Sequence, residues 1–100
     1  MAKKIANYET VVIFSVQNID EEGLAALSEK FKSLIASNGT ITNVEEWGKR
    51  RLAYPINDEN EGYYLFIEFT STPELPAELD RIYKITDGVL RSLIIVKEEQ

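Results

Sequence analysis

The sequence predicts an α+β domain in which strands and helices follow one another in the order βαββαβ. Two segments, residues 21–38 and a shorter one that starts near Pro73, repeat apolar side chains every three or four positions, as amphipathic helices do. Runs rich in β-branched and aromatic side chains predict four strands at residues 7–16, 40–57, 63–70 and 89–97. This order is typical of the ferredoxin-like fold, a four-stranded antiparallel sheet with two helices on one face and the first and third strands central.

The first helix has clear signals at both ends. Asp20 is a suitable N-cap, and Glu21 and Glu22 are favourable in the first turn because of the helix dipole. We expect Gly39 to end the helix in a left-handed conformation. One apolar stripe is formed by Leu24, Leu27, Phe31, Leu34 and Ile35.

The second strand cannot keep a strict two-residue alternation. Ile41, Val44 and Leu52 cannot all fall on one face, so we expect a bulge or kink at Gly48. Residues 57–62 are polar and predict the turn of a hairpin with the third strand. The buried face of the second helix is expected to contain Leu75, Leu79, Ile82 and Tyr83.

The third strand is apolar on both of its faces. Its uncharged set, Tyr63, Leu65, Ile67 and Phe69, is expected to face the helices. Tyr64 and Phe66 would then point outward with Glu68, beside Val11 and Ile13 of the first strand. An exposed apolar patch of this kind usually marks an interface. If instead the second set faces the helices, the first set is exposed, and another molecule still has to cover it.

Composition limits the range of functions. One hundred residues, 44% of them hydrophobic, fit one ferredoxin-like domain over residues 1–100, with a basic arm at 1–6 and a short polar tail at 97–100. No cysteine or histidine is present, which excludes disulfides, thiolate or imidazole metal sites and Ser-His or Cys-His nucleophiles. No run approaches the ~18 apolar residues of a membrane span, and the N-terminus does not resemble a secretory signal. We therefore expect a soluble, cytosolic protein.

The net charge of −6 disfavours RNA binding by this chain alone, because such binding depends on neutralising phosphates. The few cations would have to gather on one face, or a basic partner would have to supply most phosphate contacts. The densest basic run is Lys49-Arg50-Arg51. It could hold phosphates, or, together with Glu45 and Glu46, it could protect an edge strand from pairing with another copy. The two interpretations are compatible.

Residues 48–57, GKRRLAYPIN, resemble a signature of the family formed by the sixth protein of the bacterial small ribosomal subunit. The resemblance extends over nearly the whole chain, through Tyr8-Glu9, Glu45-Glu46-Trp47, Gly62-Tyr63-Tyr64 and residues 86–92. It implies a structural, non-enzymatic component of the cytoplasmic small subunit that binds small-subunit ribosomal RNA. It also implies a heterodimer with the small basic eighteenth protein of that subunit, and no metal, cofactor, membrane or small-molecule substrate.

The candidate site residues fall into two groups. For RNA we expect Arg50, Arg51 and Arg91, the last from the end motif of the family, with Lys3, Lys4, Lys49 and Lys97 secondary. For the partner protein we expect Val11, Ile13, Tyr64, Phe66 and Trp47. Arg91 could instead be a solvated or ion-paired arginine.

Two other functions are compatible with a ferredoxin-like fold. A dimeric ferredoxin-like module that senses a small molecule is the alternative, although such a module has no need of the basic signature. An acylphosphatase-like enzyme would require a phosphate-binding loop with an arginine after the first strand. Residues 15–20 contain no cation there, and the carboxylate clusters of the chain fit solvated helix starts, edges and loops better than catalytic pairs.

Overall fold

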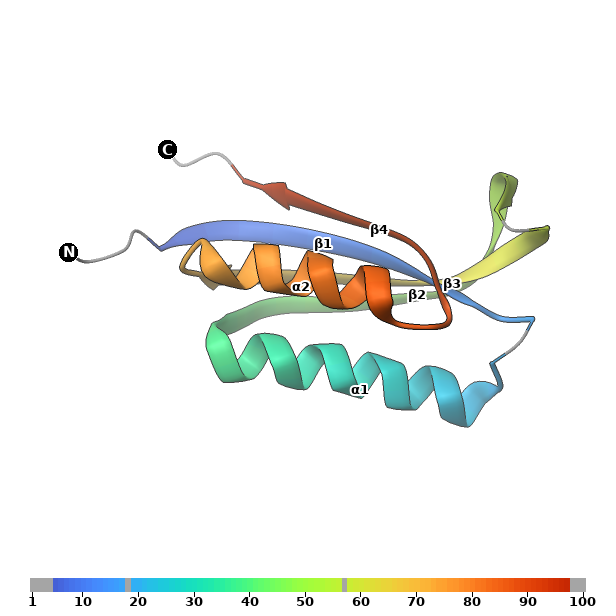
Figure 1. Cartoon of the computed structure of the whole chain (residues 1–100), viewed down its shortest axis with the longest axis horizontal. Helices are drawn as coiled ribbons and strands as arrows, with labels where there is room; N and C mark the ends of the chain where they lie inside the picture. Colours follow the sequence, from blue (N-terminus) through green and yellow to red (C-terminus); the bar gives the residue numbers. More distant parts are fainter. Residues whose placement is uncertain (1–4, 18, 57, 98–100) are drawn as a thin grey trace.

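The structure, a computed structural model, describes residues 5–17, 19–56 and 58–97. It confirms the predicted order of elements: β1 (Ala6–Ser15), α1 (Glu21–Asn38), β2 (Thr40–Ile56), β3 (Glu59–Ser71), α2 (Glu74–Ile85) and β4 (Val89–Val96). The strands form one antiparallel sheet in the order β2-β3-β1-β4, with β1 and β3 central as predicted. Both helices lie on the same face of this sheet, and the other face is open (Figure 1). None of the helices in the described residues is long and apolar enough to span a membrane.

The core lies between the sheet and the two helices. Alternate residues of the central strands point into it, from Tyr8 to Phe14 on β1 and from Leu65 to Phe69 on β3. Phe31 of α1 and Tyr83 of α2 meet there with ring centroids 4.7 Å apart. The helix-facing set predicted for the third strand is therefore correct. The opposite set, which includes Tyr64 and Phe66, faces away from the helices.

Gly39 does not end α1 in the predicted left-handed conformation. Its φ of −165° and ψ of −159° are extended, so the chain enters β2 directly from the helix. Glycine is needed there for close approach, because a Cβ would lie 2.5 Å from the carbonyl oxygen of Thr70. At the other end of the helix, the Asp20 carboxylate accepts a hydrogen bond from the backbone N–H of Gly23 at 2.8 Å, as expected of an N-cap.

The polar turn of the β2–β3 hairpin is shorter than predicted. The sequence pattern places it at residues 57–62, but β3 already begins at Glu59, and Ile56 pairs with Glu59 across the hairpin. The turn also contains Asp58, whose φ is +65°. A polar residue joins the strand here because the Glu59 carboxylate has partners: the Ser15 hydroxyl donates to its two oxygens at 2.8 and 2.9 Å. This buried contact fixes the hairpin to the end of β1.

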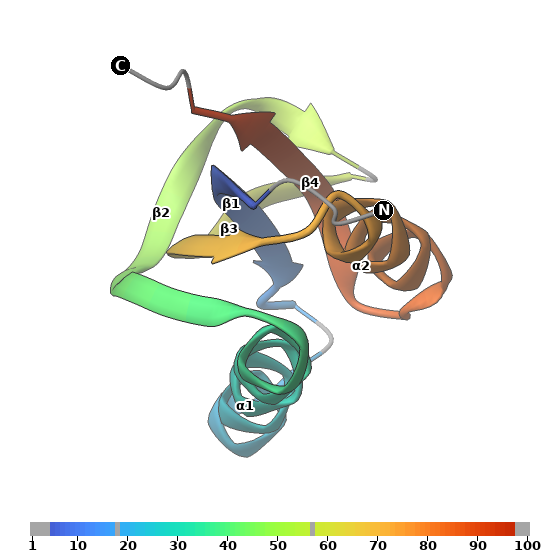
Figure 2. The same ribbon diagram turned by 90° about the vertical axis from the view of Figure 1, so that its left-hand side faces the viewer.

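β2 bends strongly along its length. The predicted irregularity at Gly48 is confirmed, because the register with β3 shifts between Glu46 and Gly48 and the φ of Gly48 is +81°. The register also shifts between Ile41 and Asn43, and again between Arg51 and Ile56, where the ladder is interrupted. Beyond it, β2 curls over the open face of the sheet toward β4 (Figure 2). Leu52 is buried by this curl, with only 8% of its surface exposed.

Candidate protein and nucleic-acid interface

The open face of the sheet carries an apolar strip across its two central strands. Val11 of β1 lies opposite Phe66 of β3, and Ile13 lies opposite Tyr64. All four are on the face away from the helices, because their neighbours along each strand are in the core. Ile13 is only 8% exposed, and its side chain lies close to Gly62, which Leu52 also approaches. Of the partner residues predicted from sequence, Ile13 therefore offers the least free surface.

Trp47, on β2, extends the apolar strip toward one edge of the sheet. Its ring stacks on Phe66 at 5.4 Å and on Tyr64 at 6.2 Å between centroids. Its Nε1 donates a hydrogen bond to a Glu45 oxygen at 2.9 Å, which fixes the orientation of the indole. Trp47 remains 37% exposed. Four of the five predicted partner residues thus form one surface, with Ile13 beneath it.

Sequence reasoning missed the contribution of β4 to this face. Leu93 lies opposite Val11 and Ile95 opposite Glu9, and these two side chains are 53% and 45% exposed. Because Leu93 to Val96 are all apolar, the sequence pattern does not show which of these side chains point outward. The alternation that starts at Arg91 was the available signal, but it needs the register with β1 to be interpreted.

The Lys49-Arg50-Arg51 run divides between the two sides of β2. The Arg50 guanidinium lies 5.4 Å from the centre of the Trp47 ring, on the open face. Lys49 and Arg51 instead line a hollow beside Val16 and Gln17, at the end of the sheet. Successive side chains of a strand point to opposite sides, so this division was predictable from sequence. The three cations therefore form two separate basic surfaces.

Arg91 and Lys97, the remaining described candidates for RNA contact, differ in their surroundings. Arg91 is exposed on the open face and donates a hydrogen bond to the Tyr54 hydroxyl. Lys97 forms an ion pair with Glu68, with 2.6 Å between Nζ and Oε2. The hydrogen bond from Lys97 holds the pKa of Glu68 below its ordinary value, and the same contact raises the pKa of Lys97. Lys3 and Lys4 lie outside the described residues.

A polar cluster on the helix side of the sheet links the edge strand β2 to its neighbours. The Glu46 carboxylate accepts hydrogen bonds from the Tyr63 hydroxyl at 2.6 Å and from Lys32 of α1 at 2.9 Å. These bonds lower the pKa of Glu46, and the bond to Glu46 raises the pKa of Tyr63 to about 12. Glu46 therefore joins α1 to β2 and β3. Among the described residues, no group of three His, Cys, Asp or Glu is placed to hold a metal ion.

Comparison with known proteins identifies the family. Residues 7–96 match the model of the family described as ribosomal protein S6. The chain belongs to the ribosomal protein S6 family. Family membership places it in the small subunit of the cytoplasmic ribosome, as part of a ribonucleoprotein that acts in translation. The resemblance predicted from the sequence is confirmed.

Individual relatives agree over almost their whole lengths. The small ribosomal subunit protein bS6 of Clostridium perfringens is 57% identical over 94 residues, which are 93% of this chain and 97% of that protein. The bS6 protein of Caldanaerobacter subterraneus is 52% identical over 90 residues, 89% and 94% of the two chains. The crystal structure of 30S ribosomal protein S6 from Thermotoga maritima superposes with a TM-score of 0.87 at 32% identity, covering 94% of this chain and 89% of that one.

Proposed function

We propose that this chain is a structural, non-catalytic protein of the small ribosomal subunit that binds small-subunit ribosomal RNA together with a small basic protein, the eighteenth of the subunit. The observation that carries the proposal is the open sheet face. Trp47, Tyr54, Leu93 and Ile95 expose large apolar surfaces on it, and Arg50 and Arg91 lie on the same face. Exposed apolar patches mark interfaces, and arginines bind phosphate in a bidentate manner.

The charge of the chain is the reason for a basic partner. With a net charge of −6, the chain repels phosphates at long range, and only a few cations are available to hold them. A cationic protein on the open face would bury the apolar strip and reverse the sign of the local field. RNA would then be bound by the pair, with Arg50, Arg51 and Arg91 as the contributions of this chain and with Lys3, Lys4, Lys49 and Lys97 secondary.

The RNA contact is tested with Arg50→Ala combined with Arg51→Ala. The affinity of the assembled protein pair for small-subunit ribosomal RNA should fall. The slope of the logarithm of affinity against the logarithm of salt concentration should become shallower by about 0.7–0.9 for each phosphate that is no longer neutralised. Arg81→Ala with Lys84→Ala removes the same charge from α2, on the opposite face, and should change neither quantity. Unchanged affinity and slope in the β2 variant would reduce these arginines to protection of an exposed edge.

Assembly is tested by sedimentation of a tagged copy from gently lysed cells. The copy should travel with small ribosomal subunits and remain with them at moderate salt. A copy that stays at the top of the gradient beside intact subunits would count against the proposal. That result would direct attention to a free dimer with a small-molecule ligand.

A further inference from the structure

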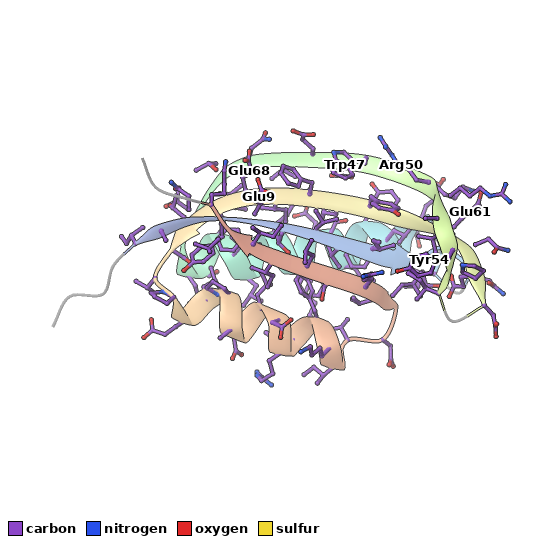
Figure 3. The ribbon with its side chains drawn as sticks, turned by 90° about the horizontal axis from the view of Figure 1, so that it is seen from above. Glu9, Trp47, Arg50, Tyr54, Glu61 and Glu68 are labelled. Carbon is purple, nitrogen blue, oxygen red and sulfur yellow. The ribbon has the colours of Figure 1, made fainter. Side chains whose placement is uncertain are left out.

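The open face is polarised along the strands, with acidic groups at one end and basic groups at the other. Glu9 and Glu68 lie toward one end of the face, and Arg50 and Tyr54 lie toward the other (Figure 3). The apolar strip of Val11, Phe66 and Trp47 separates the two ends. A protein that covers the strip therefore meets acidic groups along one of its sides and basic groups along the other.

Among the residues that the structure describes, carboxylates outnumber cations at the acidic end. Glu9 and Glu68 are paired directly across β1 and β3, an arrangement in which like charges destabilise a sheet. Glu45 on β2 adds a third carboxylate, linked to Glu68 through the side-chain amide of Asn43. Lys97 is the one ammonium group at this end within the described residues, and its ion pair is with Glu68. Glu9 forms no hydrogen bond or ion pair with any described residue, and interacts with Lys97 only at longer range.

The basic end is equally unbalanced in the opposite sense. Arg50 contacts the Trp47 ring and the Trp47 carbonyl, and Arg91 contacts the Tyr54 hydroxyl. Neither guanidinium forms an ion pair with a carboxylate of the described residues. Both retain donors for an anionic ligand, which the proposed RNA phosphates would supply.

We propose that the basic partner lies along the apolar strip with a cationic side chain at Glu9, and leaves Arg50 and Arg91 free for RNA phosphates. The proposal rests on the function proposed above and assigns the orientation of the partner and a specificity residue within that interface. Charge complementarity favours this occupant over a second copy of the chain, because two copies would together carry twice the net charge of −6. An arriving cation would also relieve the repulsion between Glu9 and Glu68.

The test compares Glu9→Gln with Glu22→Gln, which removes the same charge from an exposed position on α1. The purified eighteenth small-subunit protein of the same organism is the probe. For Glu9→Gln we expect the heterodimer dissociation constant to rise about ten-fold and its salt dependence to weaken, since paired interface charges contribute to both. Glu22→Gln should leave both unchanged. The thermal midpoint of the free Glu9→Gln chain should stay the same or rise, which separates a binding role from a folding defect.

A second arm uses the basic end. Arg50→Ala with Arg91→Ala should keep the heterodimer affinity and lower the affinity of the pair for RNA. Three results would overturn the proposal. The first is a heterodimer affinity that Glu9→Gln leaves unchanged, and the second is a loss of heterodimer affinity in the double arginine variant as large as that in Glu9→Gln. The third is a wild-type homodimer that Glu9→Gln dissociates. Absence of any heterodimer with the wild-type chain would instead refute the proposed function itself, so the two failures are distinguishable.

Discussion

Arg91 donates a hydrogen bond to the hydroxyl of Tyr54 although their strands, β4 and β2, are the opposite edges of the sheet. The contact exists because the ladder between β2 and β3 is interrupted from Arg51 to Ile56, where β2 curls over the open face. The far half of the hairpin thus lies at the end of the open face where Arg50 and Tyr54 are found. One tyrosine hydroxyl connects the two edges between which the partner is proposed to bind.

Replacing Tyr54 with phenylalanine should loosen the hairpin without unfolding the domain. The hydrogen bond joins two exposed side chains, so the free energy of unfolding should fall by no more than about 1 kcal/mol. Backbone amides of residues 52–54 and 56 should exchange faster with solvent, because the strand there is no longer held to β4. Tyr64→Phe is the matched control on the same face, and its exchange rates in this segment should be those of the wild type. Equal rates in both variants would show that the hydroxyl does not restrain the hairpin.

Substitutions of Gly39 should distinguish close approach from a left-handed cap. Gly39→Ala should lower the free energy of unfolding by about 1–3 kcal/mol, because its Cβ would collide with backbone of β3. Gly39→Asn, a change that left-handed caps accept, should be no better here. At Gly48, where φ is +81° and a Cβ would meet nothing within 4 Å, asparagine should be tolerated better than alanine. Urea unfolding of the four variants checks this, and a Gly39→Asn variant as stable as wild type would contradict it.

Two tyrosines should make the fold sensitive to alkaline pH. The bond to Glu46 raises the pKa of Tyr63 to about 12, and burial raises the pKa of Tyr83 to about 12. In the unfolded chain both groups ionise near 10. Because the folded state keeps these protons to higher pH than the unfolded chain, the contribution of the two tyrosines to stability is complete below pH 10 and is lost as the pH rises toward 12. Urea unfolding at a series of pH values should show this decline, and a flat profile above pH 10 would exclude it.

Glu46→Ala separates the two causes of these raised pKa values. Removing the carboxylate should return the pKa of Tyr63 toward 10 and leave that of Tyr83 near 12. Titration of tyrosinate absorbance in the folded variant should then show one fewer late-titrating tyrosine than the wild type. If both tyrosines still titrated late, burial rather than the hydrogen bond would govern Tyr63.

Local signals explain how much of the fold was predictable. The N-cap Asp20 and the apolar repeat gave the limits of α1 correctly, and the two-residue period of β3 gave its buried face. The bulge at Gly48 followed from a break in alternation. Such features depend on residues close together in the chain, where periodicity and capping chemistry act.

The parts that sequence did not reveal depend on distant residues. Glu59 looked like a loop carboxylate until Ser15, at the end of β1, supplied its hydrogen bonds. The curl of β2 that carries Tyr54 to Arg91 results from a register shift after Arg51 that no local pattern indicates. For the candidate site, the central strands were placed correctly. The contribution of β4 was missed because its outward residues are defined only by pairing with β1.

A double-mutant cycle should measure the buried contact between Thr10 and Tyr83, which joins the sheet to α2. Their hydroxyl oxygens are 3.0 Å apart, and both side chains are 1% exposed. Thr10→Val or Tyr83→Phe alone leaves the other hydroxyl buried without a partner, so each should lower the free energy of unfolding by about 1–3 kcal/mol. The double variant should lose less than the sum, with a coupling of about 1 kcal/mol, because no hydroxyl is then left unpaired. Strict additivity in urea unfolding would mean that the two hydroxyls do not stabilise each other.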